Sequence, residues 1–238
     1  MEAPSVDGFS LALPNAPVRN VMKFHLVYSG PLSAAGNKPK AAEAAIIRGK
    51  LSPQLEYLWE THHALQILRT EAASPPPHSG LIVAAGPQGR LSPREMARSG
   101  QFGYTDLIPA HAIAGKAFMP LVRSSLHLNC EIDILFLRQQ DPGALVSQGG
   151  DIDNRVKTLL DALRQPDADV EQKHPTPTAG EADKFVFCLL ESDTLVSRLN
   201  IDTDRLLFPE TTKPNEVHLV MEISLNVLRV SPYNQCLL

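Results

Sequence analysis

GDIDNRVKTLLDAL, residues 150–163, is the stretch of this sequence that decides the fold. Its apolar residues recur at the i, i+3, i+4 and i+7 spacing that gives a helix one buried face, at Val156, Leu159, Leu160 and Leu163. A neighbouring face carries Asp153, Lys157, Asp161 and Arg164. The segment is therefore predicted to be a loop that turns into a helix, with Asp151, Asp153 and Asn154 near the helix start.

The segments around this helix are predicted to be strands. Residues 126–137 alternate apolar and polar side chains, as in a strand with one face on the core. Further strands are predicted at 23–28, 185–190 and 217–230, with an extended segment at 194–208. A second helix is predicted from Ser52 and Pro53, as N-cap and first helical residue, to about residue 70. Strands interleaved with helices predict an α+β fold, a mixed β-sheet with packed helices.

Length and composition favour a single domain spanning residues 1–238. Two insertions are predicted, at 71–120 and 166–183. The first is rich in proline, serine, glycine and alanine at 71–99, whereas the apolar and aromatic stretch at 102–122 could pack back on the core. The sequence has no apolar run of about 18 residues and no signal-peptide pattern, so we expect no membrane span and a cytoplasmic location. The three cysteines are widely spaced, which favours reduced thiols over disulfides or a zinc site.

The charge balance limits how the chain could hold nucleic acid. A formal net charge of -4 argues against a surface that grips phosphates everywhere. One local basic cluster precedes the second predicted helix and consists of Lys38, Lys40, Arg48 and Lys50. It could contact phosphates, or it could be an ordinary solvated segment.

The two aspartates at the helix start suit a hard cation, since Mg²⁺ takes oxygen ligands and is often held by only one or two carboxylates. A purely structural interpretation is also open. Asp153 could cap the helix, Asp151 could end a turn, and Lys157 with Asp161 could form a solvated i,i+4 pair. That interpretation gives no reason for two acids to crowd together, where each raises the pKa of the other unless a cation is present.

Asp151-Ile152-Asp153-Asn154, Lys157 and Asp161-Ala162-Leu163 resemble the D-x-D-N-x-x-K-x-x-x-D-A-L signature of RusA-type Holliday-junction resolvases. The preceding strand and polar loop follow the family order, as does the downstream acidic turn at 192–196. The resemblance covers residues of about 22–60 and 126–230. It implies a RusA-like fold and a Mg²⁺-dependent endonuclease that acts as a homodimer on branched DNA, such as Holliday junctions, in recombination and repair.

The resemblance also assigns roles to residues. Asp151, Asp153 and Asp193 would be the catalytic, metal-binding acids, with Mg²⁺ as the cofactor and Mn²⁺ as a substitute. Lys157 would be a catalytic cation beside the scissile phosphate. Asn154 would support the metal ligands at the helix start, and Asp161 would pair with Lys157 at i+4. The early loop and its basic residues would contact DNA, through Lys38, Lys40, Arg48 and Lys50.

The chain also departs from the family pattern. Ser192 stands where the family has the first of two acids, so three aspartates must suffice unless Glu191 contributes. The chain is about twice as long as a minimal member and less basic. Two other functions therefore stay open: a RusA-fold module that binds nucleic acid or a protein without cutting, and a nuclease that acts on RNA or single strands.

Overall fold

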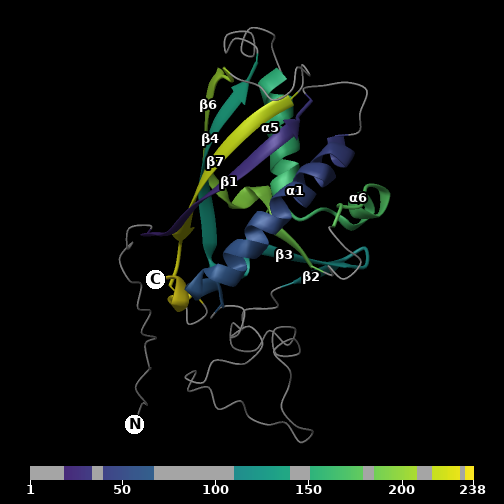
Figure 1. Ribbon diagram of the computed structural model, residues 1–238. Helices are drawn as coiled ribbons and strands as arrows, with labels where there is room; N and C mark the ends of the chain where they lie inside the picture. The colour runs from purple at the N-terminus through teal and green to yellow at the C-terminus, as the bar shows by residue number, and fades with distance from the viewer. Residues whose placement is uncertain are drawn as a thin grey trace, which may run out of the picture.

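The computed structural model describes residues 19–33, 40–66, 110–139, 151–178, 185–207, 216–230 and 234–238. They form the expected α+β fold, with mixed sheets and packed helices (Figure 1). In chain order the elements are β1 (Arg19–Pro31), α1 (Lys40–Thr61), β2 (His111–Ile113), β3 (Lys116–Val122), η2 (Ser124–Leu126), β4 (Leu128–Arg138), α5 (Asp151–Leu163), α6 (Ala168–Lys173), β5 (Phe185–Leu190), η3 (Asp193–Leu195), β6 (Val196–Arg205), β7 (Glu216–Val227) and η4 (Gln235–Leu237).

The main sheet has the strand order β1-β7-β4-β6. β4 runs parallel to β6, and the other neighbours are antiparallel. Alternate residues of β4, from Leu128 to Phe136, are buried, as the sequence pattern predicts. In β7 the same alternation runs from Val217 to Ile223, after which every residue up to Val227 is buried, including Ser224 and Asn226. The alternation places one face of these two central strands in the core.

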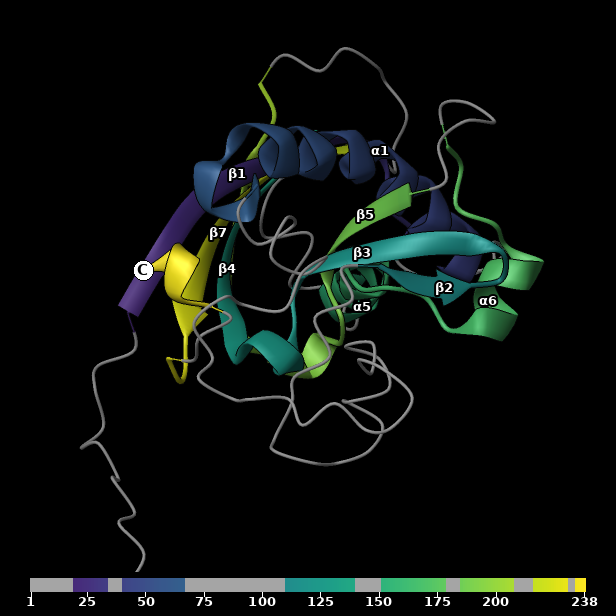
Figure 2. The ribbon, with the colours of Figure 1, turned by 90° about the horizontal axis from the view of Figure 1, so that it is seen from below.

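Helix α5 connects the parallel strands β4 and β6. Helices α1 and α5 and the second sheet all lie on one side of the main sheet (Figure 2). The helix predicted for residues 151–163 is confirmed, but its buried face is rotated from the expected stripe. Leu159 and Leu163 are buried as predicted, together with Arg155, Thr158 and Ala162, whereas Val156 and Leu160 are only half-buried.

A second, smaller sheet has the order β2-β3-β5. β3 and β5 are parallel, and the turn of the β2–β3 hairpin has positive φ at Ala114 and Gly115. The sequence pattern predicts a single mixed sheet, whereas in the structure β5 belongs to this second sheet. β3 also lies largely within the insertion predicted at 71–120, and Phe118 and Met119 are buried in the core. Residues 71–109 lie outside the described part.

The helix predicted from residue 52 begins twelve positions earlier, at Lys40. Alanine-rich residues 40–51 favour a helix, and Pro53 lies inside it. The proposed N-cap and first-turn roles of Ser52 and Pro53 are therefore wrong, and the Ser52 hydroxyl instead accepts a hydrogen bond from the Phe187 amide, at 2.9 Å. Close helix packing explains Gly49, because a Cβ there would lie 2.7 Å from the Pro177 carbonyl oxygen.

The segment predicted as a loop insertion at 166–183 contains helix α6. Its Glu171 side chain is 2% exposed and accepts hydrogen bonds from the Thr176 amide and hydroxyl, at 2.7 and 2.8 Å. Lys116 of β3 donates to the same carboxylate, at 3.1 Å. These bonds attach α6 to the second sheet. Among the helices that the structure describes, none combines the length and apolar character that a membrane crossing needs.

Candidate functional site

The first turn of α5 presents the predicted acids and lysine. Asp151 is the first residue of the helix, and its side chain lies outside the described part. Asp153 and Lys157 are both exposed, one helical turn apart. Within the described ranges neither side chain forms a hydrogen bond or ion pair. The Asp153 carboxylate and the Lys157 ammonium therefore keep their bonding capacity for a ligand.

Lys40 connects the basic cluster to this turn. Its Nζ donates to Oδ1 of Asn154 at 2.6 Å, across 114 positions of sequence. Lys40 is the first residue of α1, and Asn154 lies in the first turn of α5, so this side-chain contact links the N-terminal turns of the two helices. Each helix N-terminus carries a partial positive charge and amide donors without helical acceptors. The structure thus joins a predicted DNA-binding residue to the predicted metal-binding segment.

Arg48 holds the two helices in this arrangement. Its guanidinium is 3% exposed and donates from Nε to the Arg164 carbonyl at 3.0 Å and from Nη2 to the Asp161 carbonyl at 2.5 Å. Nη1 donates to the Thr176 hydroxyl at 3.0 Å. The prediction that Arg48 contacts DNA is therefore wrong, because its donors are used inside the protein to bind the C-terminal carbonyls of α5.

The two other lysines of the basic cluster do not join the site in the described residues. Lys50 is exposed, donates to the Ser29 carbonyl at 2.9 Å, and lies 5.3 Å from the centre of the Tyr28 ring. It therefore covers the edge of β1. Lys38 lies outside the described residues.

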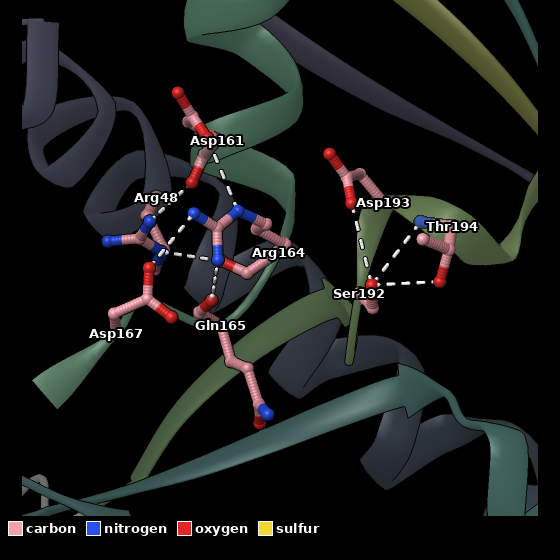
Figure 3. Close-up of polar contacts among 8 residues, drawn as sticks. All are labelled: Arg48, Asp161, Arg164, Gln165, Asp167, Ser192, Asp193 and Thr194. Atoms are coloured by element: carbon pink, nitrogen blue, oxygen red, sulfur yellow. Dashed lines mark hydrogen bonds and ion pairs between the residues drawn. The ribbon is translucent and has the colours of Figure 1, made fainter.

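Asp161 does not pair with Lys157 as predicted. Its Oδ1 accepts from Nε of Arg164 at 3.2 Å, and Arg164 also reaches Asp167 at 3.3 Å (Figure 3). The i,i+4 interpretation was wrong because Arg164, three positions after Asp161 and just beyond the end of α5, supplies a competing cation. The Lys157 ammonium is therefore not paired with Asp161, and the Asp161 carboxylate instead binds Arg164 at the C-terminal end of α5.

Asp193 lies beside the last turns of α5 (Figure 3). Arg164, just after α5, bridges to Leu190, three residues before Asp193. A helix of this length spans roughly 20 Å, and Asp151 and Asp153 lie in its first turn. Asp193 itself is exposed and accepts from the Ser192 hydroxyl at 3.4 Å.

The three-acid metal site stays a prediction. Among the side chains that the structure describes, no three His, Cys, Asp or Glu residues are arranged to hold a metal, and Asp151 is outside that set. Glu191 is engaged elsewhere, because its Oε2 accepts from the amide and hydroxyl of Ser124, at 2.9 and 2.5 Å. Ser192, which replaces a family acid, caps η3 by accepting from the Thr194 amide at 3.3 Å.

Two buried residues that the sequence analysis missed fix the chain before α1. Glu43 is 7% exposed and accepts from the amide of Ser33 at 3.0 and 3.1 Å and from its hydroxyl at 3.1 Å. Arg155 donates to the Leu32 carbonyl. Both side chains secure residues 32–33 between the starts of α1 and α5. Arg155 and Leu32 are 123 positions apart, so no local sequence pattern signals their contact.

The side chains at the N-terminal end of α5 could bind both a hard cation, through carboxylate oxygens, and a phosphate, through ammonium groups. Asp153 offers carboxylate oxygens without a competing partner in the described residues, and Asp151 is two positions away. Lys40 and Lys157 offer ammonium donors next to them. Comparisons with models of known protein families, with curated proteins and with solved structures find no match to this chain.

Proposed function

We propose that this chain is a Mg²⁺-dependent endonuclease of RusA type that cleaves phosphodiester bonds in branched DNA. The observation that carries the proposal is the 2.6 Å contact between Lys40 and Asn154, next to Asp153 and Lys157. It places the Lys40 ammonium at the N-terminal turn of α5, on the segment that carries Asp153 and Lys157. A phosphodiester with a divalent cation is the kind of ligand that this combination suits.

In this proposal some of the residues bind the metal and others bind the phosphate. Asp151 and Asp153 would hold Mg²⁺, with Asp193 as the third acid that the RusA resemblance supplies. When bound, the cation would neutralise phosphate charge and lower the pKa of a coordinated water. Lys157 would hold a phosphate oxygen or support the leaving group. Asn154, by accepting from Lys40, would fix the direction of that ammonium toward the DNA backbone.

The proposed substrate also sets expectations for binding and assembly. With few exposed cations at the site and a net charge of -4, phosphate contacts should be few and the salt dependence of binding shallow. A branched, two-fold symmetric DNA suits a homodimer that presents two sites. Such a substrate also agrees with a cytoplasmic location.

A second function, binding of branched nucleic acid without cleavage, is favoured by one observation. Asp193 lies beside the last turns of α5, whereas the other two acids lie in its first turn. Ser192 has no carboxylate, and the Glu191 carboxylate is used to accept from Ser124. A site with two acids could hold a cation and a phosphate yet lack the ligands that cleavage needs.

The test is a cleavage assay with Mg²⁺ or Mn²⁺ on four-way junctions, flaps, duplex DNA, single strands and RNA. We expect the wild type to cut a branched DNA and Asp153→Asn to cut it on the order of 100-fold more slowly. Asp169→Asn is the matched control, because Asp169 is an exposed acid in the first turn of α6. Wild-type binding without any cutting would favour the second function, and unchanged cutting by Asp153→Asn would remove Asp153 from the site.

A further inference from the structure

The two edge strands of the main sheet, β1 and β6, differ in how many of their backbone groups are hydrogen-bonded by side chains. At the β1 edge, Gln54 of α1 accepts from the Val27 amide at 2.9 Å and donates to the Val27 carbonyl at 2.8 Å. Lys50 donates to the next carbonyl of that edge, Ser29, at 2.9 Å. A side-chain amide and an ammonium thus satisfy backbone groups that would otherwise accept a further strand. The β1 edge is closed.

β6 forms the opposite edge, and within the described residues the one such contact is at its last residue, where the Asp204 carboxylate accepts from the Arg205 amide at 2.7 Å. It is ten residues long and pairs only with β4 among the strands of the main sheet. Its register with β4 shifts once, where Cys130 faces Val196 and Glu131 faces Arg198, and is regular from there to Arg205. The strand contains no proline. A long regular edge strand is a template for strand addition.

The side chains of β6 alternate between two faces. On the solvent face Arg198, Asn200, Asp202 and Asp204 are exposed. On the helix side, Leu199 and Ile201 are half-buried and pack against the core. The core therefore reaches this edge with two apolar side chains that have a neighbouring strand on one side only.

We infer that β6 pairs antiparallel with β6 of a second copy of this chain, centred on Asn200. In that register Arg198 lies opposite the partner's Asp202, and the symmetry repeats the pair on the other side of the axis. Leu199 lies opposite the partner's Ile201 on the helix side. Opposite charges and apolar pairs directly across strands stabilise a sheet, so the strand is complementary to itself.

The intrachain contacts of Arg198 favour this use. Its Nη2 lies 2.7 Å from Glu131 and 3.0 Å from Asp133, both on β4, while the side chain stays 55% exposed. The two carboxylates hold the guanidinium over the solvent face, on the β4 side of the strand. In the proposed pair the partner's Asp202 would approach the exposed side of this guanidinium from across the edge, and the pairs with β4 would stay in place.

The pairing has a geometric consequence for the assembly. In this pairing Asn200 lies opposite Asn200 of the partner subunit, and both side chains are on the same face of the sheet. The two-fold axis therefore passes between them, perpendicular to the sheet. The main sheets of two copies join into one continuous sheet, and α1 and α5 of both copies cover the same face of it. This inference depends on the sheet edge alone and stands whether or not the chain cuts DNA.

Sedimentation velocity over a range of concentrations tests the pairing with two matched charge reversals. Asp202→Lys puts a lysine opposite the partner's Arg198, and the dimer dissociation constant should rise at least about tenfold. Asp204→Lys makes the same change on the same face, but its position lies past the partner's Arg198, beyond the register shift between Val196 and Arg198, and should leave the constant within about threefold of wild type. A wild-type monomer at all concentrations, or equal weakening by both variants, would overturn the inference.

Cysteine cross-linking tests the register itself, in a Cys236→Ser background. Asn200→Cys brings two thiols face to face across a strand pair, within disulfide reach, and should oxidise to a covalent dimer. Asp204→Cys places its thiol eight positions from the partner's copy and should remain uncross-linked. Cross-linking of Asp204→Cys in preference to Asn200→Cys would contradict this register. A dimer that cross-links through neither would show that another surface joins the copies.

Discussion

Replacing Arg48 by methionine tests the role that the structure gives this residue. The guanidinium is 3% exposed and donates to the carbonyls of Asp161 and Arg164 and to the Thr176 hydroxyl. Methionine keeps much of the aliphatic volume but removes all three bonds, and it leaves the end of α5 without these donors. Burial lowers the pKa of Arg48, which reflects the cost of desolvating the cation. Replacing Arg48 by methionine therefore recovers part of the free energy spent on desolvating the guanidinium.

The net loss should be about 3 kcal/mol in the free energy of unfolding, from three charged hydrogen bonds less the recovered desolvation. Urea unfolding followed by circular dichroism measures it, provided the slope with urea is unchanged. Lys50→Met is the matched control, two positions along the same helix but exposed, and should cost less than about 1 kcal/mol. A loss below about 1 kcal/mol for Arg48→Met would refute the structural role.

Three further predictions concern other parts of the molecule. Gln54→Ala should open the β1 edge at Val27, cost about 1–2 kcal/mol and increase aggregation, as measured by urea unfolding and light scattering; unchanged values would show that the edge is closed by other means. Burial raises the pKa of Cys130 and Cys188 to about 12, so neither thiol should react with a disulfide reagent at pH 8 without denaturant. Because both thiols ionise near 9.0 once unfolded, the free energy of unfolding should fall as the pH rises above about 9, and a rise would contradict the burial. Lys157→Ala should still bind branched DNA but cut it on the order of 100-fold more slowly, whereas an equal loss of binding would make Lys157 a simple DNA contact.

Local patterns in the sequence were enough to predict most of the main sheet. β4, β7 and α5 were predicted because burial on one face of an element leaves a period in the sequence, of two residues in a strand and 3.6 in a helix. β5 was also predicted, but a continuous apolar run does not reveal which sheet will hold the strand. The start of α1 was missed because Ser52-Pro53 forms a typical helix start, and only packing shows that the helix runs through Pro53.

The candidate site was predictable only where its residues lie close together in the chain. Asp151, Asp153 and Lys157 share one segment, so their spacing could be read directly. The contact between Lys40 and Asn154 and the burial of Arg48 depend on how α1 packs against α5, across more than a hundred positions. Arg48 and Lys40 are equally basic in sequence, and only their depth in the fold separates a structural cation from one at the surface.

A crystal structure of the chain soaked with Mn²⁺, with the ion located by its anomalous scattering, tests the proposed metal site. We expect a Mn²⁺ ion at the first turn of α5, bound by Asp153 and Asp151, and no ion there in Asp153→Asn. An ion held elsewhere, for example by Asp133 and Glu222 on the open face of the main sheet, would contradict this expectation. So would the same ion at α5 in the variant.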